Sequence, residues 1–185
     1  RYLADKRRIM QVFKYQDKPQ KLEVWADTDF AGCPRTRKST SGGLVQIGEH
    51  VVKTWSTTQG VVATSSGEAE FYALCRGAAT GLGLLSYLSD LGIEAVLRCH
   101  SDSSAARAVA SRRGLGKLRH VHTRFLWLHS QVAQKALLLQ SAHGPQNPAD
   151  ALTKPLVESE LLRHCTKIGL SFDVSAPHSG GESGE

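Results

Sequence analysis

The chain has 185 residues and a formal net charge of +6; 41% of its residues are apolar and 22% are charged. This length favours one globular domain, and no segment approaches the roughly 20 uninterrupted apolar residues of a membrane-spanning helix. Its first 15 residues lack the apolar region and cleavage site of a secretory signal. Its four cysteines include no close pair with zinc-binding spacing, and a chain able to bury a real core does not need a disulfide framework. We therefore expect an intracellular protein with reduced thiols.

The positive charge is unevenly distributed. Residues 171–185 contain three acids and no Lys or Arg, so the preceding 170 residues carry a net charge of +9. A basic body suits a polyanionic partner such as nucleic acid, although solubility alone accounts for this charge in many globular proteins. Charge by itself leaves both interpretations open.

The apolar pattern predicts an α/β domain over residues 21–170, preceded by a linker at 1–20 and followed by a disordered tail at 171–185. Strands are expected at 21–27, 42–48 and 50–57, the last two forming a hairpin. A helix of about six turns follows from Ser65, because its apolar stripe repeats every three or four residues. Then come a strand at 94–102, a helix at 103–111, a basic loop, a helix at 123–134, a strand at 136–142 and a helix that starts at 147–154. This order predicts a mixed sheet of about five strands flanked by helices.

Four acids lie where open α/β sheets place their chemistry, at strand ends and helix starts. Asp27 closes the first strand, Asp102 ends the fourth, Asp150 opens the last helix and Glu70 lies in the long helix. Three of them also have purely structural explanations. Asp27, like its neighbour Asp29, suits a turn, Asp102 suits an N-cap, and Asp150 suits the first turn of a helix.

Glu70 is harder to explain structurally. Ser65 and Glu68 form a capping box, which gives Glu68 a role, but Glu70 falls on the apolar stripe that faces the sheet. A carboxylate there is costly unless it is paired, protonated or bound to a cation. Four converging carboxylates suit hard divalent cations, Mg²⁺ first and Mn²⁺ as a substitute, and paired metals suit phosphoryl transfer. The basic surface would then hold a nucleic-acid backbone.

These residues lie in motifs that closely resemble the ribonuclease H domain of copia-type LTR retrotransposon polyproteins. The motifs are WADTDFAGCPRTRKSTSGG, the TW of KTWSTTQ, ATSSGEAEFYAL, CHSDSSAA, RHVHTR and NPADALTKPL, in the order and at the spacings of that family. The resemblance covers about residues 24–156. It implies that residues 1–20 are the tail of the connection to a reverse transcriptase domain, which would be a partner in the same polyprotein, in the cytoplasm or a virus-like particle.

The resemblance implies a ribonuclease H-like fold whose first three strands are antiparallel. It also implies endonucleolytic hydrolysis of the RNA strand of an RNA/DNA hybrid with two Mg²⁺ ions, leaving 3′-hydroxyl and 5′-phosphate ends. By resemblance, Asp27 bridges both metals, Glu70 and Asp102 hold the leaving-group metal, and Asp150 holds the nucleophile-side metal. Relatives carry a His about ten residues before the last aspartate, where this chain has Gln140. His143 is a candidate assistant, although a solvent-exposed loop His explains it as well.

Two basic groups are candidates for binding the substrate backbone. The first follows the catalytic strand and comprises Arg35, Arg37, Lys38, Ser39 and Thr40. The second is the basic loop, with Arg112, Arg113, Lys117, Arg119, His120 and His122. A solvated hairpin loop explains the first group equally well, and the second group could follow the other strand of the duplex. Trp25, Trp55 and Trp127 are expected in the core rather than as base-stacking platforms.

Two other functions compete with the nuclease. A decayed or recruited retroelement domain would bind the hybrid without cutting it, but all four acids are present in this chain. A DNA-cutting integrase or resolvase shares the expected fold, but the RKSTSGG and ADALTKP motifs disfavour it.

Overall fold

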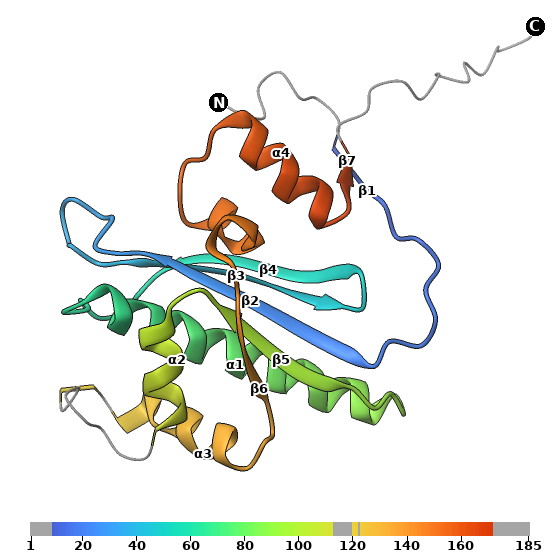
Figure 1. Cartoon of the computed structure of the whole chain (residues 1–185), viewed down its shortest axis with the longest axis horizontal. Helices are drawn as coiled ribbons and strands as arrows, with labels where there is room; N and C mark the ends of the chain where they lie inside the picture. The colour runs from blue at the N-terminus through green and yellow to red at the C-terminus, as the bar shows by residue number, and fades with distance from the viewer. Residues whose placement is uncertain (1–8, 113–119, 122, 172–185) are drawn as a thin grey trace, which may run out of the picture.

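A computed structural model describes residues 9–112, 120–121 and 123–171. Its centre is a five-stranded sheet in the order β4-β3-β2-β5-β6 (Figure 1). The strands are β2 (Lys21–Asp29), β3 (Thr40–Ile47), β4 (His50–Thr58), β5 (Val96–Ser101) and β6 (Leu138–Ser141). β2, β3 and β4 are antiparallel neighbours, whereas β5 runs parallel to β2 and β6 parallel to β5. This order and these directions are those of the ribonuclease H-like fold, so the predicted fold class is confirmed.

The long helix α1 (Ser66–Asp90) covers one face of the sheet, and Ser65 caps it as predicted. Its predicted stripe faces the strands. A Cβ added at Gly77 would lie 2.9 Å from Val24, and one at Gly81 would lie 2.6 Å from Leu97. These two glycines therefore let α1 approach the sheet closely, over a core that includes Phe71.

The predicted capping box at the start of α1 is only half correct. The backbone N–H of Glu68 donates to the Ser65 hydroxyl, at 3.2 Å. The Glu68 carboxylate, however, accepts from the backbone N–H of Thr64 at 2.9 Å rather than from that of Ser65. Because Glu68 also accepts from the Tyr72 hydroxyl at 2.5 Å, it ties the loop before α1 to the next turn of the helix.

The segment after β5 is broken into shorter helices than the sequence predicts. α2 (Ser104–Ser111) matches the expected helix. The helix expected at 123–134 is instead a 3₁₀ turn, η1 (Thr123–Phe125), followed by α3 (Trp127–Ala133). Trp55 is buried as expected, at 8% exposure, and the Trp25 ring stacks on His100 with ring centroids 4.0 Å apart.

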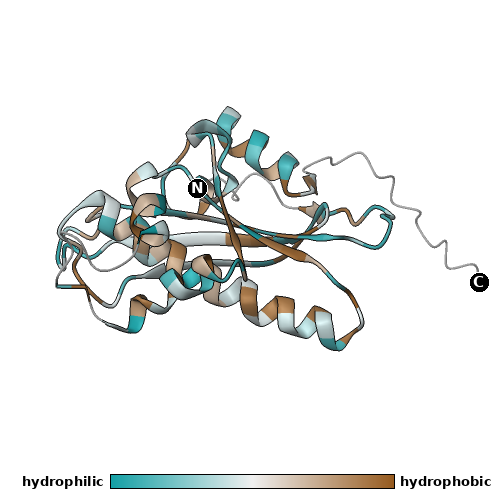
Figure 2. Ribbon diagram, turned by 60° about the horizontal axis from the view of Figure 1, so that its bottom comes forward, coloured by the Kyte–Doolittle hydropathy of each residue, from teal (hydrophilic) through white to brown (hydrophobic). Residues whose placement is uncertain are grey.

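The other face of the sheet is covered by the C-terminal part of the chain, so the sheet lies between α1 and α4 (Figures 1 and 2). The helix expected from 147 is only a 3₁₀ helix, η3 (Pro148–Leu152), which follows a shorter one, η2 (Gly144–Gln146). The chain then forms α4 (Glu158–Lys167), which the sequence analysis did not predict. Pro155 separates the two helices because proline disfavours a helical conformation at the residue before it.

The chain on either side of these elements forms a small second sheet. β1 (Met10–Gln11) pairs antiparallel with β7 (Leu170–Ser171), and the Gln16 amide reaches the Ile47 carbonyl at 3.1 Å. Residues 9–20 therefore contact the domain, while the proposed division at 20 and 171 stays a prediction. Within the described residues, no helix is long and apolar enough to cross a membrane.

Candidate metal centre

The register of two parallel strands brings Asp27 and Asp102 to the same edge of the sheet. Trp25 pairs with His100 in the β2–β5 ladder, and each aspartate comes two residues later in its strand direction. The structural explanations for both acids are wrong. Asp27 lies within β2 and is fully buried, and the N-cap of α2 is Ser103, whose hydroxyl accepts from the Ala106 N–H at 3.1 Å.

Glu70 completes a cluster of three carboxylates. One oxygen each from Asp27, Glu70 and Asp102 lie within 4.8 Å of one another. α1 brings Glu70 to this edge of the sheet because its first turns lie beside the ends of β2 and β5 (Figure 1). The Oε2 atom of Glu70 is buried and has no hydrogen-bond partner among the described residues.

The electrostatics of the cluster favour protonation when nothing neutralises it. Burial and the charges of Asp27 and Asp102 raise the pKa of Glu70 to about 9, with Lys154 opposing them. Burial raises the pKa of Asp27 to about 6, although the Thr153 hydroxyl and Lys154 pull it down. Buried neighbouring carboxylates behave in this way because each ionisation disfavours the next.

The three carboxylates fit a divalent cation. Their oxygens are hard ligands of the type that Mg²⁺ and Mn²⁺ prefer, and they lie close enough together to share one ion. The unpartnered Glu70 oxygen supports this interpretation because a bound cation would supply the partner it lacks. The donor set therefore fits the metal that the sequence analysis expects, and Asp27, Glu70 and Asp102 would hold it.

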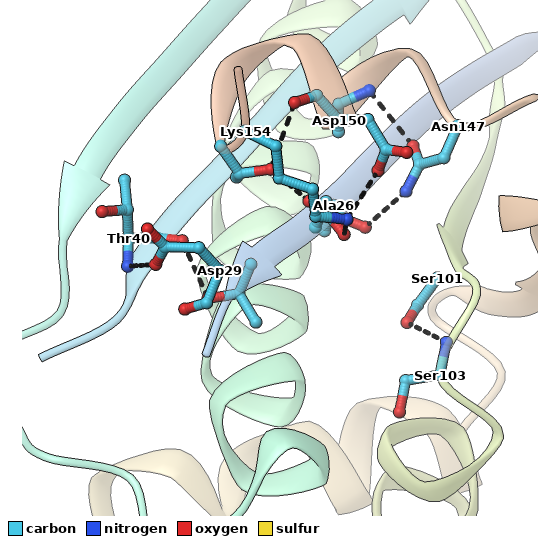
Figure 3. Close-up of polar contacts among 12 residues, drawn as sticks. Ala26, Asp29, Thr40, Ser101, Ser103, Asn147, Asp150 and Lys154 are labelled. Carbon is cyan, nitrogen blue, oxygen red and sulfur yellow. Dashed lines mark hydrogen bonds and ion pairs between the residues drawn. The ribbon is translucent and has the colours of Figure 1, made fainter. Parts of the chain in front are cut away.

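Asp150 lies next to this cluster but is not one of its three members. It sits in η3, and its carboxylate is joined to Asp27 through Lys154, whose ammonium nitrogen lies 3.3 Å from an oxygen of each (Figure 3). Thr153 also donates a hydrogen bond to Asp27. Burial raises the pKa of Asp150, while Lys154 opposes that shift.

Sequence analysis missed Thr153 and Lys154. Both belong to the ADALTKP motif, but their contact with Asp27 joins positions about 126 residues apart, which no local spacing could have indicated. The available signal was the i, i+4 spacing of Asp150 and Lys154, which brings acid and base together on one helical face.

Two features hold η3 against the sheet. Asn147 caps it, and its side-chain amide donates to the Ala26 carbonyl at 3.1 Å (Figure 3). Gly42 lies directly opposite Asp27 in the β2–β3 ladder, and a Cβ there would be 2.5 Å from Thr153. The absence of a side chain at Gly42 therefore lets η3 reach Asp27.

Asp29, the rival of Asp27, serves the hairpin instead. Its carboxylate accepts a hydrogen bond from the backbone N–H of Thr40 on the adjacent strand (Figure 3). It is not one of the three carboxylates that cluster at the end of β2. The geometry therefore gives Asp29 a structural role in the turn.

His143 lies on the loop that passes the cluster. It is exposed and precedes η2. A Cβ added at the next residue, Gly144, would lie 3.5 Å from the Asp102 carboxylate, so the loop backbone runs beside the site. Its proposed assistance to catalysis stays a prediction.

The first basic group is only partly available to a substrate. Arg35 and Arg37 are exposed and Lys38 is half-buried. Ser39 is 1% exposed, and its hydroxyl accepts from the backbone N–H of Ala31. The cations can meet a phosphate, but the Ser39 hydroxyl is used within the loop, and Thr40 is half-buried.

Most of the second basic group lies outside the described residues, namely Arg113, Lys117, Arg119 and His122. Of the rest, Arg112 is half-buried, and His120 lies with Nε2 2.9 Å from the Glu68 carboxylate. His120 therefore fastens the end of this loop to the start of α1, near Glu70.

Sequence analysis also missed a small hollow beside α1. It has a volume of about 210 Å³ and is lined by Thr57, Thr58, Arg76 and Arg124, among others. Gln59 forms part of its wall and links β3 to α1 through the Ser41 hydroxyl and the Ala69 carbonyl, both at 2.9 Å. Hydroxyls beside two guanidinium groups are suited to an anionic ligand.

Comparison with known proteins finds relatives among transposon polyproteins. The chain is 28% identical over 154 residues to the retrovirus-related Pol polyprotein from transposon RE1 of Arabidopsis thaliana, a match that covers 81% of the chain and 10% of that protein. It is 30% identical over 136 residues to the retrovirus-related Pol polyprotein from transposon TNT 1-94 of Nicotiana tabacum, a match that covers 72% of the chain and 10% of that protein. The chain thus spans about a tenth of these curated relatives.

Among solved structures, an RNase H1 isolated from compost has a TM-score of 0.47 and 17% identity, with 72% of this chain and 92% of that chain covered. No family model matches the chain. The fold assignment therefore rests on strand order and direction.

Proposed function

Because the chain is a homologue of the retrovirus-related Pol polyproteins of copia-type transposons, we propose that it is a ribonuclease H that cuts the RNA strand of RNA/DNA hybrids. The observation that carries this proposal is the carboxylate cluster at the end of β2, with its buried, unpartnered Glu70 oxygen. Such a cluster on a basic domain suits hydrolysis of a nucleic-acid phosphodiester. We propose two Mg²⁺ ions as cofactors, with Mn²⁺ as a substitute.

The roles of the four acids are those that the resemblance implies. By resemblance Asp27 would be a ligand common to both metals, and its burial beside Glu70 and Asp102, with Lys154 joining it to Asp150, supports that role. Glu70 and Asp102 would hold the metal on the leaving-group side, and Asp150 the metal on the nucleophile side. When bound, the metals would activate the attacking water and offset the charge that develops on the phosphate. The products would be a 3′-hydroxyl and a 5′-phosphate.

The chain's own cations would hold the hybrid in place. Arg35, Arg37 and Lys38 follow the catalytic strand, and Arg76 and Arg124 line the hollow beside α1. The two groups lie on different elements, so they could contact the two strands of a duplex. Such contacts with phosphate fix the position of the substrate without reading its sequence.

The experiment that tests this function uses an RNA strand labelled at its 5′ end. The RNA is presented alone, annealed to RNA and annealed to DNA, in Mg²⁺. We expect cleavage of the RNA in the hybrid only, with products that a polymerase can extend from their 3′-hydroxyl. Tight binding of the hybrid with no cleavage in Mg²⁺ or Mn²⁺ would instead support the non-catalytic binding function.

A reverse transcriptase domain of the same polyprotein is the proposed partner, because the relatives are Pol polyproteins of which this chain matches about a tenth. Adding that domain in trans should lower the Michaelis constant for the hybrid. The intracellular location stays a prediction.

A further inference from the structure

Lys154 lies where two of the proposed metal ligands face each other. Its ammonium nitrogen is 3.3 Å from both oxygens of Asp27 and 3.3 Å from Oδ1 of Asp150. Together these contacts place a positive charge at ion-pair distance from both carboxylates, which the proposed function assigns to one metal.

The pair of acids and the lysine differ in their access to solvent. The Asp27 side chain is 1% exposed and that of Asp150 is 15% exposed, whereas the Lys154 side chain is 41% exposed. The carboxylates of Asp27 and Asp150 both lie within ion-pair distance of the ammonium. The ammonium is therefore a bound cation on a flexible four-carbon stem with an open path to solvent.

Glu70 and Asp102 complete the cluster with Asp27, and among the described residues no donor reaches Glu70 Oε2. In the part of the chain that the structure describes, the ion pairs of Lys154 are with Asp27 and Asp150 and not with Glu70 or Asp102. Within these residues, the ammonium therefore pairs with the acids unevenly.

We propose that Lys154 is an internal counter-cation, which neutralises Asp27 and Asp150 in the metal-free protein and must leave before a divalent cation can bind between them. This inference rests on the proposed function, because it assumes that Asp150 is a metal ligand. The two metals then bind with unequal affinity. The first occupies the side of Glu70 and Asp102, and the second binds more weakly because it competes with Lys154.

The test is a Mn²⁺ titration of the whole chain, in which free Mn²⁺ is followed by electron paramagnetic resonance. Lys154→Met keeps the length of the side chain and removes its charge, and Lys154→Arg keeps the charge. Lys53→Met is the matched control, because Lys53 is exposed on β4, away from the cluster. Thermal unfolding in chelator is measured on all four proteins.

Wild type should bind two Mn²⁺ ions, one tightly and one weakly. Lys154→Met should bind the weaker ion about tenfold more tightly, because the metal no longer has to displace a charge-assisted contact. The affinity for the tighter ion should change little. Its melting temperature in chelator should fall, because Asp27 loses its buried counter-charge. Lys154→Arg should not tighten the weaker site, and Lys53→Met should match wild type.

An unchanged or weaker second affinity in Lys154→Met overturns the inference, even if the protein cuts hybrids. Unequal Mn²⁺ sites that respond to Lys154→Met support it, even if no hybrid is cut, and in that case only the proposed activity fails. Wild type that binds no Mn²⁺ overturns both.

Discussion

Glu68 and Glu70 lie two residues apart in α1, yet their pKa values move in opposite directions. Burial disfavours charge on Glu68, but hydrogen bonds from Thr64, Tyr72 and His120 outweigh it and lower its pKa to about 2. Glu70 is buried beside other acids with too few donors, and its pKa rises to about 9. Hydrogen-bond donors therefore decide which glutamate is a structural anion and which one needs a cation.

The pKa of Glu70 predicts a pH dependence of stability. The unfolded chain releases this proton near pH 4.5, whereas the metal-free folded protein keeps it to about 9. The folded state thus binds one more proton across this window, and its stability should fall as the pH rises. Glu70→Gln cannot ionise, so it should flatten the profile and be more stable by about 1 to 3 kcal/mol at pH 8. Urea unfolding in chelator at about pH 5 and about pH 8 measures this, and parallel profiles would contradict it.

Bound metal should reverse that dependence, because the ligands must be ionised to bind it. The rise in melting temperature caused by Mg²⁺ should therefore grow between about pH 6 and about pH 9. The same scans on Glu70→Gln serve as the control and should show a smaller response. A Mg²⁺ response that is independent of pH would exclude Glu70 and Asp27 as ligands.

The positions of Asp27 and Asp29 predict that the same substitution to Asn affects hybrid cleavage very differently at the two residues. Asp27→Asn removes a member of the cluster and should lower hybrid cleavage at least about hundredfold. Asp29→Asn changes a hairpin contact and should keep most of the activity, with a loss of stability of about 1 kcal/mol. Cleavage rates and urea unfolding of both variants check this. Inactive Asp29→Asn beside active Asp27→Asn would reverse the assignment.

At the scale of elements, the packing of η3 on the sheet determines whether the site is complete. Gly42→Ala would place a Cβ 2.5 Å from Thr153 and 2.9 Å from Leu152. This overpacking should displace η3, lower cleavage at least about tenfold and destabilise the fold by about 1 to 3 kcal/mol. Rates and urea unfolding measure both effects.

Gly83→Ala in α1 is the matched control for that substitution. A Cβ at Gly83 meets nothing within 4 Å. Alanine there should stabilise the protein by about 0.5 to 1 kcal/mol, because it favours the helix more than glycine does. If Gly42→Ala behaved like Gly83→Ala, the close contact of η3 would not matter.

The elements that sequence analysis predicted correctly have strong local patterns. The α1 stripe and the Ser65 cap gave the helix, and two apolar runs around a short polar turn gave β3 and β4. Three of the missed elements lack such patterns. β1 and β7 have two residues each, and the 3₁₀ turn η3 has the composition of a helix start. β1 and β7 form because the two ends of the domain pair with each other, and the conformation of η3 depends on its packing against the sheet.

The residues of the candidate site also divide into those with a local sequence signal and those that only tertiary packing brings to the site. Asp27, Asp102 and Glu70 could be predicted because a strand end or a misplaced charge on an apolar stripe is visible in the sequence. Thr153 and Lys154 could not, because their contacts with Asp27 depend on the docking of η3. The same holds for the burial of Ser39 and the pairing of His120, which only tertiary structure reveals.

At the scale of the whole molecule, the distribution of charge predicts how the hybrid is bound. The first 170 residues carry a net charge of +9, and exposed cations such as Arg35 and Arg37 lie in the loop that follows β2. Binding through phosphates releases counterions, so hybrid affinity should fall at least about tenfold between about 50 and 200 mM salt. Fluorescence anisotropy with a labelled hybrid measures this. An affinity independent of salt would contradict backbone binding.

The central claim is that the carboxylate cluster is a metal-dependent nuclease site, and one gel assay tests it most directly. The RNA strand of a hybrid is followed in Mg²⁺, in Mn²⁺ and in chelator, with Asp102→Asn purified in parallel. Cleavage in either metal, none in chelator and none by Asp102→Asn is the predicted result. Cleavage that persists in chelator, or that Asp102→Asn performs as fast as wild type, would contradict the claim.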